Sequence, residues 1–176
     1  MSEQKDKWQG RLALSTAIMA VLAALTTLYM GKFSSRAIMA QGQESDQWAF
    51  YQAKSIKGHT FETNKTTLEL QYLAQKGLAP ETKAEYQKII QKYGDEIKRY
   101  DGEKKEIKDK AESIAKAKLK AQDMGGNFAY ALIFLQIALM LSSIASLTKR
   151  HYLWYIALIC NLGWLFFFLD AWLMFY

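Results

Sequence analysis

The sequence has few of the residues that build disulfides, metal centres or nucleophilic active sites. Its 176 residues include one cysteine, Cys160, and two histidines, His59 and His151. A single cysteine excludes an intrachain disulfide, and the two histidines lie far apart, outside any cluster with metal-ligand spacing. The HExxH, CxxC and nucleophile motifs are missing as well. We therefore expect no metal site, no catalytic residues and no enzymatic activity.

Motifs for binding nucleotides or nucleic acids are also missing. The stretch GKFSSR, which follows Met30, lacks the GxxxxGK[ST] spacing of a phosphate-binding loop. The net charge is +6, but acidic residues alternate with the basic ones and leave no separate basic patch. We expect no cofactor and no nucleic-acid partner. We interpret the excess positive charge as surface solubility with weak attraction to anionic lipid headgroups.

Charge is nearly missing from three long stretches. Residues 12–30, 128–147 and 152–176 contain one charged side chain between them, whereas residues 31–127 hold 32 of the 40. These apolar segments have 19, 20 and 25 residues, and a helix needs about 20 to cross a bilayer. Aromatic residues gather near their ends, as they do in membrane proteins. The sequence therefore predicts an all-α fold with three transmembrane helices in contact with membrane lipid, and a soluble helical region between the first and the second.

Basic residues favour one orientation in the membrane. The N-terminal tail, residues 1–11, carries three Lys or Arg, and the turn of residues 148–151 contains Lys149 and Arg150. Short basic loops tend to stay in the cytoplasm, which would place the N-terminus inside and the soluble region outside. The soluble region contains 18 Lys and Arg of its own, so the opposite orientation stays open. The first apolar segment is longer than a typical signal-peptide core, and we expect it to be retained.

The second half of the soluble region, from about Pro80 to Gln122, has the strongest repeat in the chain. Its members follow one another at alternating spacings of four and three, which keeps them on one face only if the helix supercoils against a partner. We name this face the Tyr–Ile stripe. It consists of Tyr86, Ile90, Tyr93, Ile97, Tyr100, Lys104, Ile107, Ala111, Ile114, Lys118 and Ala121.

The first half, from about Ser34 to Lys76, is also predicted to be helical, with two lanes of residues. One lane contains Ile38, Ser45, Ala49, Gln52, Ile56, Thr63, Leu70 and Leu73, and the other contains Phe50, Phe61 and Leu68. Two lanes indicate two neighbours. One lane would meet the Tyr–Ile stripe in an antiparallel coiled-coil hairpin, and the other would meet a second subunit. Between the arms, Gly77 suits a helix end and Pro80 a helix start.

The expected hairpin, residues 31–127, has long arms but is only two helices thick. Each arm has roughly 40 residues and so reaches about 60 Å. Because two helices bury only one narrow seam, we predict homo-oligomers in which hairpins stand side by side. The sequence MGGN at residues 124–127 predicts a break before the second transmembrane helix. There Gly125 and Gly126 would end one helix and Asn127 would cap the next.

The segment SDQWAFYQAKSIK, residues 45–57, resembles the signature of a bacterial membrane-protein family known as domain of unknown function 4337. The order of one apolar helix, a charged helical region and two further apolar helices is similar to that family over essentially the whole chain. The resemblance implies a multi-pass protein of the bacterial inner membrane. It implies no activity, because the family's function is unknown. Gly58 departs from the pattern and leaves the continuity of the first arm open at that point.

Within this segment, Trp48 and Tyr51 fall on one face of a helix. They could form a docking surface for a partner protein or another copy of the chain, or they could anchor a packed seam. Both interpretations place them at an interface. The candidate interface residues are Trp48, Tyr51, Ile56, Tyr86, Ile90, Tyr93, Ile97, Tyr100, Ile107 and Ile114.

Polar side chains inside the predicted transmembrane helices are the remaining functional hint. Gln136, Asn161 and Asp170 would be costly in contact with lipid and should turn toward other helices. They could form interhelical hydrogen bonds, with Asp170 near the headgroups, or they could line a path through an oligomer. The sequence thus predicts a non-enzymatic, self-associating scaffold or interaction protein. The alternative is an oligomeric channel or transporter component.

Overall fold

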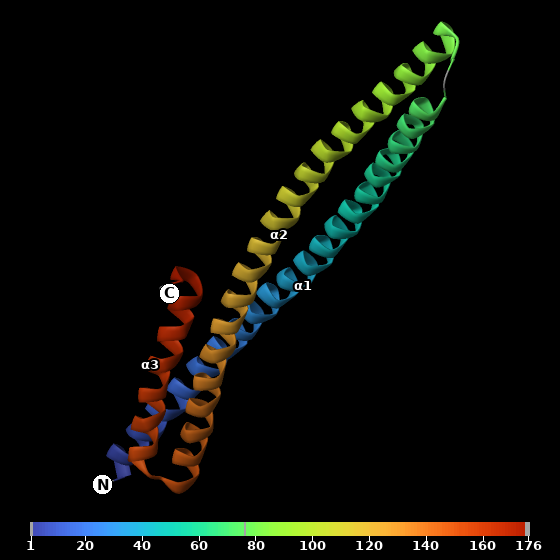
Figure 1. Ribbon diagram of the computed structural model, residues 1–176. Coiled ribbons are helices and arrows are strands. Elements are labelled where there is room, and N and C mark those ends of the chain that lie inside the picture. Colours follow the sequence, from blue (N-terminus) through green and yellow to red (C-terminus); the bar gives the residue numbers. More distant parts are fainter. Residues whose placement is uncertain (1, 76, 175–176) are drawn as a thin grey trace. The chain divides into compact units, whose positions relative to one another are not determined.

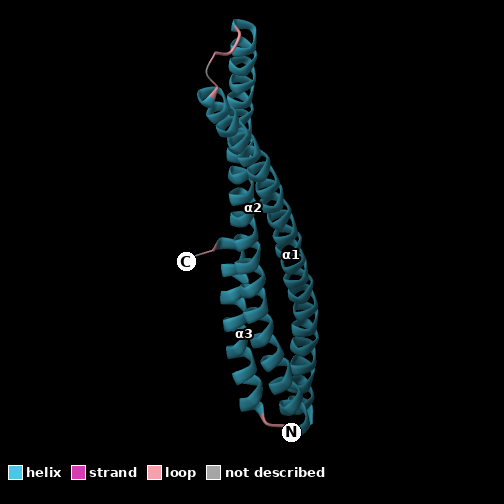
Figure 2. Ribbon diagram, turned by 45° about the vertical axis from the view of Figure 1, so that its right-hand side comes forward, coloured by secondary structure: helices cyan, strands magenta, loops and turns pink. Residues whose placement is uncertain are grey.

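The computed structural model describes residues 2–75 and 77–174, with side chains from residue 8 onward. Over this part of the chain it contains three helices and no strand (Figure 2). The helices are α1 (Ser2–Ala74), α2 (Pro80–Thr148) and α3 (His151–Leu173). The all-α prediction is confirmed. Residues 175 and 176, the end of the predicted third transmembrane helix, lie outside the described residues.

Both connections between helices are short. α1 ends at Ala74 and α2 begins at Pro80. Between them Gly77 has a φ of 87°, a conformation that glycine adopts readily because it has no Cβ. Lys149 and Arg150 join α2 to α3, and Lys149 has a φ of 56°. The turn between α1 and α2 therefore contains Gly77, the residue whose type favoured a helix end in the sequence.

The predicted break at residues 124–127 is wrong. α2 runs without interruption from Pro80 to Thr148, through both Gly125 and Gly126. A Cβ on Gly125 would lie 3.5 Å from Ser34 Oγ, an ordinary van der Waals distance, so α1 and α2 are in contact there. This packing outweighs the helix-propensity cost of about 1 kcal/mol per glycine. Asn127 lies inside α2 and caps no helix.

The first arm is also continuous at the glycine where the sequence left a doubt. α1 passes through Gly58 without a break. Gly58 is buried, and a Cβ built on it would lie 3.6 Å from Tyr100 Cβ on α2. The glycine therefore sits at a contact between the two arms, where a small residue keeps the helices close.

The chain divides into two compact units, which are described separately. We name the unit of Met1–Met39 and Ala117–Tyr176 the bundle, and the unit of Ala40–Lys116 the hairpin. In the hairpin, the arms of α1 and α2 lie side by side, joined at the turn (Figure 1). The hairpin as a compact unit is shorter at both ends than the predicted soluble region of residues 31–127.

In the bundle, segments of all three helices pack against one another (Figure 1). The two core clusters consist of Met19, Leu135, Ala138 and Ala157, and of Phe33, Met124, Phe128 and Ala171. Alanines at the contacts allow the helix axes to approach closely, which increases dispersion contacts. Each of the three helices contains a stretch that is long and apolar enough to cross a membrane, judged by length and composition.

Candidate functional site

The seam of the hairpin is built from aromatic rings. Phe61 of α1 stacks on Tyr100 of α2 with ring centroids 5.8 Å apart, and lies 5.5 Å from Tyr93. Nearer the turn, Tyr72 of α1 meets Tyr86 of α2 at 5.9 Å. Ring pairs in such geometries add about 0.5–1.5 kcal/mol each beyond the area that they bury. They hold the two arms in register.

The Tyr–Ile stripe is used for packing within the chain. Tyr100 and Ile107 are each 8% exposed and Ala111 is fully buried. The other candidate interface residues on α2 are half-buried, namely Tyr86, Ile90, Tyr93, Ile97 and Ile114. The Tyr–Ile stripe therefore lies in the contact between the two arms. Little of its surface stays exposed for the binding of another copy.

On the first arm, the lane that contains Phe61 and Leu68 faces α2. We name it the inner lane. It consists of Tyr51, Lys54, Gly58, Phe61, Lys65, Leu68 and Tyr72, at alternating steps of three and four. Phe50, which the sequence analysis placed in this lane, is 50% exposed and does not belong to it. The alternating spacing is present in the sequence, but two lysines and a glycine interrupt the apolar pattern, so hydrophobicity does not reveal the inner lane.

The remaining lane of the first arm is exposed. Ile56, Leu70 and Leu73 are 67%, 63% and 76% exposed. Trp48 is 37% exposed, and its ring meets the half-buried ring of Tyr51 edge-on at 5.7 Å. Of the three candidate interface residues on α1, Tyr51 therefore lies in the inner lane, and Trp48 and Ile56 are turned toward solvent.

An ion pair between Lys54 and Glu103 joins the arms across the seam. Lys54 Nζ lies 2.6 Å from Glu103 Oε2, and it also lies 5.5 Å from the centroid of the Tyr100 ring. The hydrogen bond from Lys54 lowers the pKa of Glu103 below its ordinary value, against a smaller opposing effect of desolvation. Solvent reaches both side chains and screens their attraction. The pair therefore serves more to set the register of the arms than to stabilise them.

Asp170 is buried inside the bundle. It is 1% exposed, and its Oδ2 accepts a hydrogen bond from Asn127 Nδ2 at 2.5 Å. A buried carboxyl group needs such a donor because burial removes its water. The bond joins α3 to α2, so Asp170 faces the interior of its own chain. Asn127, expected to be a helix cap, is instead its partner.

The other two polar candidates lie further along the same helix pair. Gln136 on α2 is exposed, whereas Asn161 on α3 is half-buried. The Oδ1 atom of Asn161 is enclosed and accepts no hydrogen bond from the part of the chain that the structure describes. The three residues named in the sequence analysis are thus not gathered at one point of a single chain.

Two indole groups, which the sequence analysis did not single out for contacts, join α3 to α1. Trp164 Nε1 donates a hydrogen bond to Thr26 Oγ1 at 3.1 Å, and Trp154 Nε1 donates to Ser15 Oγ at 3.0 Å. Aromatic residues near the ends of the apolar segments were interpreted only as a feature of membrane proteins, and these inward bonds were not predicted. The available signal was the presence of hydroxyl groups in the first apolar segment, since a buried indole N–H needs an acceptor.

The residues capable of metal binding or redox chemistry have ordinary surroundings. His59 Nδ1 lies 2.8 Å from Glu62 Oε2, and the ring of His151 meets that of Trp8 edge-on at 4.2 Å. Cys160 packs against the first core cluster. Among residues 2–75 and 77–174, no three His, Cys, Asp or Glu side chains gather where they could hold a metal ion.

These features define a class: an all-helical protein in which three helices form a two-armed hairpin and a bundle containing three apolar segments. Residues 8–174 match the family model described as Domain of unknown function (DUF4337), and the chain belongs to this family. The family suggested by residues 45–57 is thereby confirmed. Comparisons with curated proteins and with solved structures found no match.

Proposed function

We propose that this chain is a non-enzymatic, multi-pass membrane protein whose hairpin self-associates, so that it acts as a scaffold or interaction module. The observation that carries the proposal is the exposed side of α1 in the hairpin. Ile56, Leu70 and Leu73 lie there on an ordered helix and keep 63–76% of their surface accessible. Apolar surface that is gathered on one face of a folded element marks a place that a partner covers.

The thickness of the hairpin supports the same proposal. Between Ala40 and Lys116, the buried positions with apolar side chains are Tyr100, Ile107 and Ala111. Two helices joined by one seam are marginally stable over such a length, because most of their surface stays in water. Association of hairpins would bury a second seam and add to their stability.

The proposed location is the bacterial inner membrane. Three segments with the length and composition of transmembrane helices support it, and they are long enough to cross a hydrocarbon core of about 30 Å. The basic residues of the N-terminal tail and of the turn at Lys149 and Arg150 favour a cytoplasmic N-terminus. The hairpin would then lie outside the cytoplasm.

Mass determination of the whole chain in nanodiscs tests self-association. One chain has a mass of 20.2 kDa, and we expect particles that contain at least two chains. A particle with a single chain at every protein concentration contradicts the proposal. The side of the membrane is tested by a cysteine at Glu81, near the turn, in a Cys160→Ser background. An impermeant thiol reagent should label it in intact spheroplasts, and labelling only after lysis would reverse the proposed orientation.

A channel or transporter component is the second candidate function, favoured by the polar residues of α2 and α3. Asn127 bonds Asp170, and Gly163 lies against the ring of Phe134, so the two helices run antiparallel. This pairing places Gln136 and Asn161 at one level of the bundle, where an enclosed amide oxygen of Asn161 is available to accept a hydrogen bond. Polar groups at one depth of a membrane helix pair are typical of conduction paths.

Ion flux into liposomes separates the two functions. Under the channel proposal, Asp170→Ala and Asn161→Ala change the flux while the particle mass stays the same. Under the scaffold proposal, neither the wild-type chain nor either variant conducts above empty liposomes. Asp170→Ala should then only weaken the bundle, because it leaves the Asn127 amide without its acceptor, at a cost of about 1–3 kcal/mol.

A further inference from the structure

The side of α1 opposite the inner lane carries a regular uncharged face. We name it the outer face and define it as the first, fourth and fifth residues of each heptad counted from Ala49 to Ala74. All twelve of these residues are exposed, and none is Asp, Glu, Lys or Arg. The five charged residues in this stretch lie elsewhere on the helix, and they are Lys54, Lys57, Glu62, Lys65 and Glu69.

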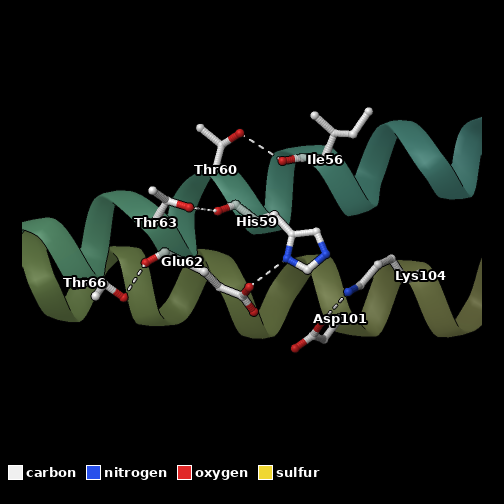
Figure 3. Close-up of polar contacts among 8 residues, drawn as sticks. All are labelled: Ile56, His59, Thr60, Glu62, Thr63, Thr66, Asp101 and Lys104. Carbon is white, nitrogen blue, oxygen red and sulfur yellow. Dashed lines mark hydrogen bonds and ion pairs between the residues drawn. The ribbon is translucent and has the colours of Figure 1, made fainter.

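Threonine hydroxyls on the outer face need no water. Thr60 Oγ1 donates to the carbonyl oxygen of Ile56 at 2.9 Å, and Thr63 Oγ1 donates to that of His59 at 2.9 Å (Figure 3). Thr66 and Thr67 donate to carbonyls four residues earlier at 3.0 and 2.8 Å. A hydroxyl that already donates within its helix can enter a dry interface without an unsatisfied donor. Each of these threonines then acts as a small apolar side chain.

Aliphatic side chains complete the face. Ile56 and Thr60 point away from α2 (Figure 3), and Ile56 and Leu70 stand fourteen residues apart, both at the first heptad position. Between Ile56 and Thr63 lies a shallow depression bordered by His59, Thr60 and Asn64. Large and small residues therefore alternate along the face, which is the surface relief that a facing helix can interlock with.

We propose that the outer face binds the outer face of a second copy, with the two α1 arms parallel and in register. The inference rests on the proposed self-association and on a common membrane, which makes hairpins of two copies parallel. In this register Ile56 packs on Ile56 and Leu70 on Leu70, as at the first position of a parallel coiled coil. Because both copies use the same patch, the contact closes as a two-fold pair.

Charges at the border of the face fit this arrangement. In a parallel pair, the seventh position of one heptad faces the fifth position of the next heptad on the other helix. Glu62 and Glu69 occupy seventh positions, and they would face Thr67 and Ala74 of the second copy. Trp48, also at a seventh position, would cover Ala53. Among the Asp, Glu, Lys and Arg side chains, no like charges meet across the pair, so these residues do not oppose the binding of a second copy.

The face is as long as a short coiled coil. The 26 residues from Ala49 to Ala74 form about 39 Å of helix. With the seventh positions at its border, Trp48, Ser55, Glu62 and Glu69, each copy contributes 16 residues, the set that a parallel two-stranded coiled coil of this length buries. Side chains of the second copy would also cover the part of Trp48 that is now exposed.

Site-directed disulfide formation tests the proposal in the full chain, reconstituted in nanodiscs. All variants carry Cys160→Ser. Ile56→Cys and Leu70→Cys place thiols on the outer face, and Lys57→Cys and Gln71→Cys are matched controls one residue further along, exposed but off the face. A disulfide requires Cα atoms within about 4.4–6.8 Å. We expect mild oxidation to link Ile56→Cys and Leu70→Cys into dimers at least tenfold faster than either control.

The other outcomes overturn the inference in distinguishable ways. If particles contain several chains but the controls link as fast as the outer-face variants, or no variant links, copies associate through another surface and the proposed self-association stands. If every particle contains one chain, the outer-face contact and the proposed self-association are both wrong. A second variant, Ile56→Glu with Leu70→Glu, should reduce the particle to one chain while helix content by circular dichroism stays unchanged. Gln71→Glu, next to Leu70 but off the face and exposed, should leave the particle mass as it is.

Discussion

The bundle and the hairpin bury their side chains to very different degrees. In the bundle, Phe128, Leu135 and Ala138 are fully buried. In the hairpin, the best-buried large side chains, Tyr100 and Ile107, each keep 8% of their surface, and Ile56 keeps 67%. A helix in the bundle has two helical neighbours, whereas an arm of the hairpin has one. The hairpin therefore leaves part of its apolar surface exposed, and so does the bundle, where Leu14, Val21 and Leu28 are 61–65% exposed.

Polar groups show the same difference. In the bundle they form neutral or charge-assisted hydrogen bonds between helices, such as Trp164 to Thr26 and Asn127 to Asp170. In the hairpin they form ion pairs at the border of the seam, such as Lys54 with Glu103. In each bundle bond one partner is buried, Asp170 or Thr26, whereas the side chains of Lys54 and Glu103 are 23% and 33% exposed. Water therefore screens the ion pair more than the bonds of the bundle. We expect polar contacts to contribute more to the bundle than to the hairpin, and the following changes test this contrast.

The largest effect is expected from Phe128→Ala in the bundle. The ring of Phe128 lies 5.4–6.1 Å from those of Tyr29, Phe33, Phe168 and Trp172. Its removal leaves a cavity among them and should lower the free energy of unfolding by about 3–5 kcal/mol. Thermal unfolding in detergent measures the loss. Phe166→Ala, at a position that is 54% exposed, is the control; equal losses from both variants would contradict the packing described for the bundle.

Phe61→Ala should have the next largest effect, and should act on the hairpin. It removes the contacts with Tyr93 and Tyr100 from a half-buried position, so we expect a loss of about 2–3 kcal/mol. Hydrogen exchange should become faster in both arms and stay unchanged in the bundle. Phe50→Ala, at a 50% exposed position, should change exchange little. If Phe50→Ala opened the arms as much as Phe61→Ala, the assignment of the inner lane would be wrong.

Two glycines of the bundle should respond to alanine with opposite signs. A Cβ on Gly163 would lie 2.7 Å from the ring of Phe134, whereas a Cβ on Gly126 meets nothing within 4 Å. Gly163→Ala forces the ring to shift and should cost about 1–2 kcal/mol. Gly126→Ala should stabilise α2 by up to about 1 kcal/mol, the gain in helix propensity. Thermal unfolding of the two variants measures both changes in stability. A gain in stability from Gly163→Ala would show that α2 and α3 are further apart at Phe134 than described.

The smallest effect is expected from the ion pair of the hairpin and depends on pH. Lys54 lowers the pKa of Glu103, so the pair stabilises the hairpin above the ordinary pKa of glutamate. This stabilisation is lost as the pH falls through the lowered pKa. Glu103→Gln should remove that part of the acid dependence, measured by hydrogen exchange of the arms. Glu106→Gln, at an exposed position on the same helix, should leave it unchanged, and identical pH profiles for wild type and Glu103→Gln would exclude a contribution of the pair.

The two arms of the hairpin differ in how well the hydrophobic pattern of the sequence predicts their contact face. On α2, Tyr and Ile recur at heptad spacing, and the contact face could be read directly. On α1, the contact face includes Lys54 and Gly58, which no hydrophobic pattern selects. Lys54 is tolerated there because Glu103 lies opposite, and Gly58 because Tyr100 packs against it. Both partners are more than 40 residues away in the sequence, so the pattern of α1 alone could not show the contact.

At Gly125 and Gly126 the sequence predicted a feature that the structure does not contain. Local propensity predicts a helix end there, yet the helix continues, because Gly125 lies against Ser34 and Asn127 bonds Asp170. The prediction failed since contacts with α1 and α3 outweigh a local cost of about 1 kcal/mol per glycine.

The sequence by itself determined the helical character of the chain, the three apolar segments and the turn at Gly77 and Pro80. These follow from composition, periodicity and local backbone preference, which act along the chain over a few residues. Only the tertiary structure decided which side of α1 meets α2, which side is left exposed, and that Asp170 is buried beside Asn127. Those outcomes depend on free energies of contact between residues remote in sequence, and no local pattern contains them.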